Sequence, residues 1–133
     1  MSGLAYLDAS ALVKLVQRES DTAALEHDLA HRDGILCSRL GATELRRACA
    51  RARHPRLLQQ VDDVLESVFL VEVSPAILES AGRLKPALLR TLDAIHLATL
   101  QSFGEPVDLI TYDDRLGAAA KSHGFAVVSP KER

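Results

Sequence analysis

Short apolar runs alternate with longer amphipathic segments along the whole chain. Five runs rich in leucine, valine and isoleucine have the length and composition of buried strands: 4–7, 34–38, 69–73, 107–111 and 125–129. Seven segments between them have apolar residues at helical spacing, and several open after Ser, Thr, Asp or Pro: 9–18, 21–31, 42–53, 57–66, 76–85, 92–103 and 115–123. The pattern therefore predicts strands separated by helices.

Such an order predicts an α/β protein with a mainly parallel sheet, because the crossovers between parallel strands are made by helices. The strands are uniformly apolar rather than alternating, which is typical of a sheet covered on both faces. We therefore expect a three-layer α/β/α fold. No internal repeat, low-complexity segment or linker interrupts the pattern, so we expect a single domain over 1–133.

Composition narrows the class of protein only slightly. The 133 residues are 47% hydrophobic and 26% charged, as in globular proteins, and the net charge of −2 argues against general attraction to phosphate backbones while leaving room for a local basic patch. Cys37 and Cys49 form no C-x-x-C pair, which favours two buried thiols in a reducing compartment. The apolar start is broken by Asp8, Ser10 and Lys14, so we expect neither a secretory signal nor a membrane span, and a cytoplasmic location.

Four acids stand at places where a parallel sheet has its functional crevice, beyond the carboxyl ends of the strands. Asp8 follows the first strand directly, and Asp113 comes just after the fourth. Glu44 lies in the first turns of the helix after the second strand, and Asp93 opens the helix that leads into the fourth. We expect all four side chains to reach the same edge.

Carboxylates gathered at one edge repel each other, and a divalent cation is the simplest relief. Mg²⁺ fits best, with Mn²⁺ as the other candidate, because hard cations prefer oxygen ligands and are commonly held by one or two carboxylates with water. Zinc fits poorly, since His27 and His31 form the only histidine pair at i, i+4 spacing and lack the acid of an H-E-x-x-H motif. A solvated helix face explains that pair better.

Each acid also has a purely structural explanation. Asp8 and Asp113 could cap the helices that follow them, and the first turn of a helix favours an acid such as Asp93. Glu44 could pair with the arginines that follow it on the same helix surface. The coincidence of four acids at one edge, each in an apolar or alanine-rich setting, favours a functional site.

Four stretches match a known family in order and over nearly the whole chain. They are "YLDASALVKL" at 6–15, "GATELRRA" at 41–48, "TLDAIHLATL" at 91–100 and "LITYDDRLGAAAKSHGFAVV" at 109–128. With these stretches the sequence resembles the PIN-domain ribonucleases, in particular the VapC-type toxins of toxin–antitoxin pairs. The resemblance implies a PIN fold and a metal-dependent endoribonuclease that cleaves RNA, either tRNA or rRNA, through metal-activated water.

The resemblance also assigns roles to residues. The acidic quartet of the family matches Asp8, Glu44, Asp93 and Asp113, of which Asp8, Asp93 and Asp113 are the expected metal ligands. Ser10 matches a position that supports the first acid, and Thr111 precedes the fourth acid in the T-x-D pattern of the family. Asp114 could serve as a helix cap or an auxiliary acid.

His96 lies three residues after Asp93 and could face the same way as a base or a partner of the acids. Because the activity of the family rests on the acids, a structural role is favoured for this histidine. Positive charge for RNA is available at Arg46 and Arg47, within "RRACARARHPR" at 46–56, although such a run is often only a solvated face.

Partners follow from the resemblance alone: an RNA substrate, a cognate VapB-type antitoxin and a second copy in a homodimer, with no membrane. Two other readings remain. A receiver-like, phosphate-accepting signalling domain needs paired acids after the first strand and an acceptor Asp after a central one, whereas this chain has Asp8 alone, then Val73 and Ser74. A catalytically silent PIN-fold binding module is disfavoured by the four intact acids.

Overall fold

The five strands form one parallel sheet in the order β3-β2-β1-β4-β5 in the computed structural model, which describes residues 1–133. The strands are β1 Leu4–Leu7, β2 Gly34–Ser38, β3 Phe69–Val71, β4 Asp108–Ile110 and β5 Val127–Val128. β1 is central, and its Ala5 lies opposite Ile35 of β2 on one side and Asp108 of β4 on the other. The predicted parallel α/β architecture is confirmed.

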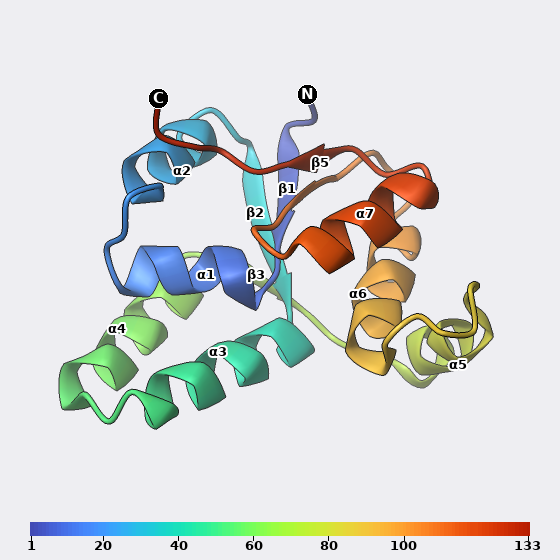
Figure 1. The fold of residues 1–133 in the computed structure, drawn as a ribbon, viewed down its shortest axis with the longest axis horizontal. Coiled ribbons are helices and arrows are strands. Elements are labelled where there is room, and N and C mark those ends of the chain that lie inside the picture. Colours follow the sequence, from blue (N-terminus) through green and yellow to red (C-terminus); the bar gives the residue numbers. More distant parts are fainter.

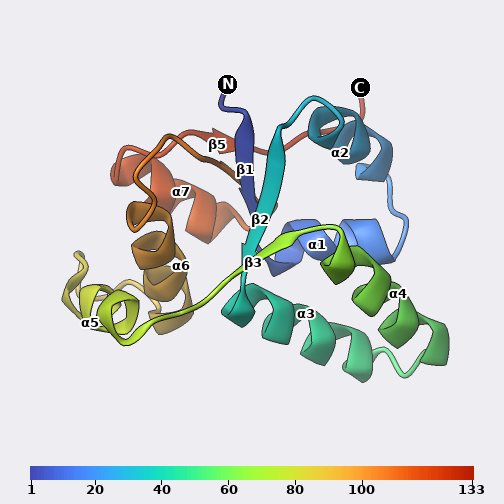
Figure 2. The same cartoon turned by 180° about the vertical axis from the view of Figure 1, so that it is seen from behind.

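Seven helices cover the sheet in two layers. They are α1 Ala9–Val16, α2 Thr22–Leu29, α3 Arg39–Arg51, α4 Pro55–Glu66, α5 Pro75–Arg83, α6 Thr91–Gln101 and α7 Asp114–Ser122. The sheet is seen edge-on in Figure 1, with α1 to α4 on one side and α5 to α7 on the other, and Figure 2 shows the same division from behind. None of these helices combines the length and the apolar composition needed to cross a bilayer.

The central strand shows why the strand sequences are uniformly apolar. Ala5 and Leu7 are fully buried in the core that packs against α1 to α4, whereas Tyr6 is fully buried in the core formed with α6 and α7. Successive side chains of a strand point to opposite faces, so a sheet covered on both faces needs apolar residues throughout. Each fully buried leucine contributes roughly 1.5–3 kcal/mol.

Three expectations need correction. The run 69–73 forms a strand only over Phe69–Val71, and this strand lies at the edge of the sheet instead of the centre. The run 125–129 pairs only over Val127–Val128. The helix expected from residue 42 begins at Arg39, because Ser38 caps it by accepting a 3.0 Å hydrogen bond from the Gly41 backbone N–H.

The two cysteines are buried and free, as predicted. Burial raises the pKa of the Cys37 thiol to about 11, and it also raises the pKa of Cys49. Both thiols therefore remain protonated near neutral pH and pack as small apolar groups.

The carboxyl ends of β1, β2 and β4 meet at one edge of the sheet. α1 and α3 begin directly after β1 and β2, and α7 begins a few residues after β4. This carboxyl edge lies at the lower centre of Figure 1, and both chain termini lie at the opposite end of the molecule. The fold thus brings together the residues that follow β1, β2 and β4, among which the sequence places Asp8, Glu44 and Asp113.

Candidate active site

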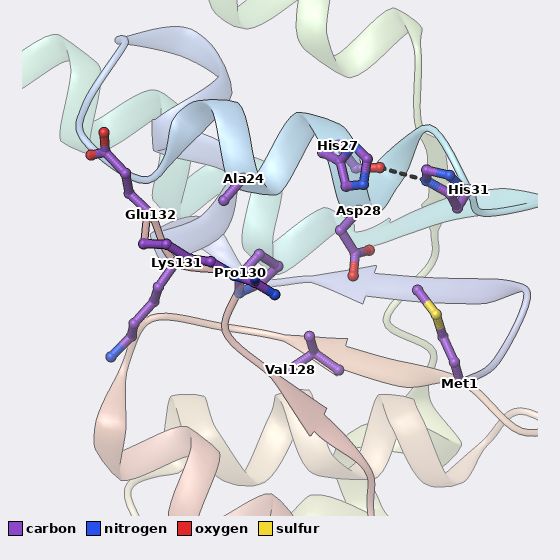
Figure 3. A pocket seen from close by; sticks show the side chains of 10 residues that line it. Met1, Ala24, His27, Asp28, His31, Val128, Pro130, Lys131 and Glu132 are labelled. Carbon is purple, nitrogen blue, oxygen red and sulfur yellow. Dashed lines mark hydrogen bonds between the residues drawn. The ribbon is translucent and has the colours of Figure 1, made fainter.

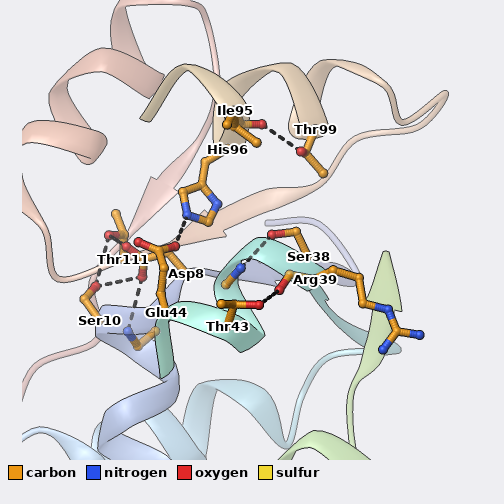
Figure 4. Close-up of polar contacts among 12 residues, drawn as sticks. Asp8, Ser10, Ser38, Arg39, Thr43, Glu44, Ile95, His96, Thr99 and Thr111 are labelled. Carbon is orange, nitrogen blue, oxygen red and sulfur yellow. Dashed lines mark hydrogen bonds and ion pairs between the residues drawn. The ribbon is translucent and has the colours of Figure 1, made fainter. Parts of the chain in front are cut away.

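Asp8 occupies the sharp turn between β1 and α1, and only 5% of its surface is exposed. Its Oδ1 accepts hydrogen bonds from the Ser10 hydroxyl at 2.7 Å and from the Ala11 backbone N–H at 3.2 Å, and its Oδ2 accepts one from the Thr111 hydroxyl at 2.7 Å (Figure 4). Burial raises the pKa of this carboxyl group even though the hydrogen bonds oppose the shift. The side chain is therefore held in one orientation.

Ser10 and Thr111 bind Asp8 with their only hydroxyl protons. The Ser10 oxygen accepts from the Tyr112 backbone N–H at 2.8 Å, and the Thr111 oxygen accepts from the Asp113 backbone N–H at 3.0 Å. A hydroxyl group donates one hydrogen bond, so neither proton is available for the 3.2 Å contact between the two hydroxyl oxygens. The ends of β1 and β4 are thus joined through Asp8.

Asp93 lies in the first turn of α6, at the position that the sequence predicts, and it is 8% exposed. The helix cap, Arg90, makes no side-chain capping bond, and no group of the chain donates a hydrogen bond to the Asp93 carboxylate. Its pKa is raised by burial and, secondarily, by the negative charge of Asp113. Every fully buried side-chain oxygen of the protein has a partner, so the carboxylate oxygens of Asp93 must reach solvent.

Glu44 comes to the same edge from α3 and contacts His96 of α6. The distance from Glu44 Oε1 to His96 Nε2 is 2.8 Å (Figure 4). The other ring nitrogen of His96 lies 2.7 Å from the Tyr6 hydroxyl. Glu44 is 29% exposed and His96 only 3%. The pKa values of Asp8 and Asp93 are raised chiefly by burial, and a positive charge on His96 would oppose both shifts, so the ring lies near three of the four acids.

Asp113 is exposed and caps α7, since its Oδ1 accepts from the backbone N–H groups of Arg115 at 2.9 Å and Leu116 at 3.2 Å. Asp114 is the first residue of that helix and is also exposed. The structural explanation from the sequence therefore holds for Asp8 and Asp113, because each caps the helix that follows it, through Oδ1 only. Asp93 makes no such cap.

The arginines near Glu44 do not pair with it. Arg46 instead lies 2.7 Å from Asp62 of α4, in an ion pair of which both side chains are about half exposed. Arg47 is exposed on the same helix. A surface pairing explanation for Glu44 is therefore wrong, and RNA contact by Arg46 or Arg47 stays a prediction.

The donor set at this edge fits a hard divalent cation better than a soft one. Asp8 and Asp93 present carboxylate oxygens, Asp113 is close enough to Asp93 to raise its pKa, and no cysteine lies among them. No three acidic, histidine or cysteine side chains stand together as a finished metal cage. Mg²⁺ commonly keeps several waters and takes one or two carboxylates, so the oxygens of Asp8 and Asp93 suit it.

Sequence reasoning missed the role of Tyr6 as the hydrogen-bond partner of His96. The sequence did show that Tyr6 needs a hydrogen-bond partner, because it is a tyrosine in an otherwise aliphatic strand and a buried hydroxyl is usually hydrogen-bonded. Nothing in the sequence identified that partner, since Tyr6 and His96 lie 90 residues apart.

A pocket lies away from the acids, at the opposite end of the molecule from the carboxyl edge. Its volume is about 690 Å³, and it opens between α2 and the C-terminal residues, where Figure 3 shows Asp28, His27 and His31. His31 Nδ1 is engaged at 2.8 Å by the backbone oxygen of His27, and both histidines are exposed or nearly so. A solvated helix face, as predicted for this pair, describes these groups.

Comparison with known proteins agrees with the geometry. The family model of the PIN domain matches residues 5–122. Ribonuclease VapC46 of Mycobacterium tuberculosis is 43% identical over 132 residues, covering 94% of this chain and 96% of the relative. Ribonuclease VapC35 of the same species is 41% identical over 130 residues, with the same two coverages of 94% and 96%.

Solved structures share the fold at lower identity. A toxin–antitoxin complex from Klebsiella pneumoniae superposes with a TM-score of 0.73 at 22% identity, covering 97% of this chain and 99% of that one. VapC20 of Mycobacterium tuberculosis, described as a toxin that cleaves the sarcin–ricin loop, gives 0.73 at 19% identity, with coverages of 94% and 98%. With the family model, the two relatives and the acidic edge in agreement, this chain belongs to the PIN-domain family and, within it, to the VapC ribonucleases.

Proposed function

We propose that this VapC-family ribonuclease is a Mg²⁺-dependent endoribonuclease and the toxic component of a toxin–antitoxin pair. The observation that supports the proposal most is the state of Asp93. The residue is nearly buried, its carboxylate has no hydrogen-bond donor from the protein, and the charge of Asp113 lies close by. A protein seldom keeps such a charge unless an external cation or substrate group completes the site. We propose further that the 133 residues act as one PIN domain.

Asp8, Asp93 and Asp113 hold the cation in this proposal, and Mn²⁺ can replace Mg²⁺. A divalent cation at this place supplies positive charge at the scissile phosphate and lowers the pKa of the attacking water. Ser10 and Thr111 keep Asp8 aimed at the edge, and their hydrogen bonds leave lone pairs of both carboxylate oxygens available. Asp113 caps α7 through Oδ1, so its Oδ2 is available to the cation.

Glu44 orients the attacking water. Its side chain is the more exposed of the pair with His96, and only Oε1 contacts the histidine, so Oε2 can accept a hydrogen bond from water. The water attacks phosphorus in line, the 3′ oxygen of the preceding nucleotide leaves, and the products carry a 5′-phosphate and a 3′-hydroxyl. No side-chain nucleophile takes part.

The proposed substrate is structured RNA, either tRNA or rRNA, and the proposed partners are a VapB-type antitoxin and a second copy of the chain. Solved neighbours include the Klebsiella toxin–antitoxin complex and VapBC2 from Rickettsia felis bound to a promoter DNA fragment, which superposes with a TM-score of 0.71 at 13% identity. The acidic edge offers an antitoxin a place for an arginine or lysine side chain. Arg46 and Arg47 are the proposed RNA contacts, and the cytoplasm is the proposed place of action.

The test is cleavage of total tRNA and rRNA by the purified protein. We expect activity with Mg²⁺ or Mn²⁺, loss in excess EDTA and recovery when Mg²⁺ is restored, with 5′-phosphate ends mapped by sequencing. Cleavage that persists in excess chelator contradicts the metal mechanism. A folded protein that binds RNA but never cuts it with either cation supports the silent binding module instead.

A further inference from the structure

His96 is held between one buried partner and one partly exposed partner. On its inner side the Tyr6 hydroxyl lies 2.7 Å from Nδ1, and on its outer side Glu44 Oε1 lies 2.8 Å from Nε2. The rings of Tyr6 and His96 meet edge to face, with centroids 5.8 Å apart and an interplanar angle of 77°. The three side chains come from β1, α6 and α3, so they join both layers of the fold at the carboxyl edge.

The hydrogen bonds determine which nitrogen of His96 carries the proton. An ionised Glu44 carboxylate can only accept, so Nε2 must donate to it. A neutral imidazole then has an acceptor at Nδ1, and the Tyr6 hydroxyl must donate to that nitrogen. The phenolic O–H group of Tyr6 is a hydrogen-bond donor, so it can fill this role.

Glu44 depends on this contact more than the other acids depend on theirs. Asp8 accepts three hydrogen bonds from the protein, and Asp113 accepts two from the first turn of α7. Glu44 has a longer side chain and the single partner His96. Glutamate loses considerable rotamer freedom when it is ordered, so without His96 its carboxylate would sample several orientations at the surface.

We propose that His96 is a positioning residue that holds the Glu44 carboxylate in its working orientation, and that Tyr6, by donating to Nδ1, stabilises the tautomer of His96 that Glu44 requires. The proposal rests on the proposed function of Glu44 as the group that orients the attacking water. The Tyr6 hydroxyl, the imidazole and the carboxylate thus form one chain of hydrogen bonds that runs from the core to the acidic edge. Figure 4 shows the outer part of this chain, the contact between His96 and Glu44.

Kinetics of four variants test the role of His96. We expect His96→Leu to lower kcat about 10- to 100-fold, the usual cost of removing a group that orients an active residue, with KM unchanged. His96→Gln keeps a donor toward Glu44 and should recover most of the rate. Tyr6→Phe keeps the packing and should show a smaller fall in kcat. Thr99→Val is the matched control, because it deletes a buried 2.7 Å hydrogen bond one turn further along α6, to the Ile95 carbonyl.

A double-mutant cycle shows whether His96 acts through Glu44. In a Glu44→Ala background, we expect His96→Leu to cost less than about twofold, because the group that it positions is gone. An equal loss in both backgrounds means that His96 acts on another acid or on the substrate, and it overturns the proposal. A loss of similar size for Thr99→Val also overturns it, since the effect would then be general weakening of α6.

The tautomer can be observed without any cleavage assay. In ¹⁵N-labelled protein we expect the His96 ring signals to report a proton fixed on Nε2, and the His96→Gln variant assigns them. Tyr6→Phe should shift these signals toward the averaged values of a histidine that exchanges between tautomers. A proton fixed on Nδ1 overturns the proposal. This measurement stands even for a protein that cuts no RNA, so failure of the proposed function and failure of this inference remain distinguishable.

Discussion

At the amino edge of the sheet Asp108 is 4% exposed and forms an ion pair with Arg32, whereas at the carboxyl edge Asp93 is 8% exposed and forms neither an ion pair nor a hydrogen bond with a donor of the chain. Arg32 is fully buried and lies 2.8 Å from Asp28 as well. Burial alone would raise the pKa of Asp108, but the hydrogen bonds from Arg32 and from the Ser2 backbone outweigh it, and the pKa lies below its ordinary value. The pKa values of Asp8 and Asp93 are raised.

Burial does not distinguish these two acids, because both residues are nearly buried. They differ in their partners, since Asp108 has an ion pair with Arg32 and Asp93 has none. A buried charge without a partner costs stability, so an acid that remains in that state contributes something other than stability. The comparison predicts opposite responses to substitution at the two edges.

The largest effect is expected from the acids of the carboxyl edge. Asp8→Asn and Asp93→Asn should lower RNA cleavage by at least about a thousandfold, or about 4 kcal/mol of lost transition-state stabilisation. Thermal stability without metal should hold or rise, because one like charge is removed. Cleavage assays and melting curves measure both effects, with Asp63→Asn on the exposed face of α4 as the control. If the metal-free variants melt far below the metal-free wild type, the role of these acids is to stabilise the fold.

The next effect concerns the cation of the amino edge. Arg32→Met should lower the free energy of unfolding by about 3 kcal/mol, because Asp108 stays buried and Asp28 half-buried without their partner. The matched control is Arg18→Met, which removes the exposed ion pair of Arg18 and Glu26 and should cost less than about 1 kcal/mol. Urea denaturation measures both variants. Equal costs would show that the buried pair contributes no more than a surface pair.

Metal binding should distinguish the acids of the two edges. Mg²⁺ at about 100 times its dissociation constant should stabilise the protein by about 2.7 kcal/mol, since it binds the folded state. Thermal shifts should show this gain in the wild type and in Glu44→Gln, and Asp93→Asn should lose it. The Arg32→Met variant should keep the shift, because its site is at the other edge. A full Mg²⁺ shift in Asp93→Asn contradicts the assignment of Asp93 as a ligand.

The smallest effect is a pH dependence of opposite sign at the two edges. Asp108 has a lowered folded pKa, so its contribution is present above the unfolded pKa of about 3.9 and is lost as the pH falls through the folded value. Asp93 has a raised folded pKa, so it weakens the fold at neutral pH and this cost disappears as the pH falls through that value.

Denaturation of Asp108→Asn and Asp93→Asn over a pH series tests these signs. At neutral pH the first variant should be less stable than the wild type, and the second should be as stable or more stable. The stability difference between each variant and the wild type should become smaller as the pH falls. For Asp93→Asn this should happen at a higher pH than for Asp108→Asn. The same sign for both variants would show that the two carboxylates have similar environments.

The sequence by itself determined the elements, their order and the edge at which the acids gather. Local spacing carries this information, because apolar periodicity distinguishes strands from helices, and parallel strands place the residues that follow them together. Asp8 and Asp93 lie where the sequence predicts them. Boundaries were less accurate, since Ser38 starts α3 earlier through its cap and since pairing, which periodicity does not report, ends β3 at Val71.

Only the tertiary structure decided which groups are partners. Arg32 and Asp108 are 76 residues apart, Glu44 and His96 are 52, and Tyr6 and His96 are 90. No local pattern links such positions, because these contacts exist only after the crossovers have brought β1, α3 and α6 to one edge. Whether a nearly buried carboxylate has a cation paired with it depends on that packing. The same packing therefore decides the contrast between Asp108, which Arg32 stabilises, and Asp93, which we propose as a metal ligand.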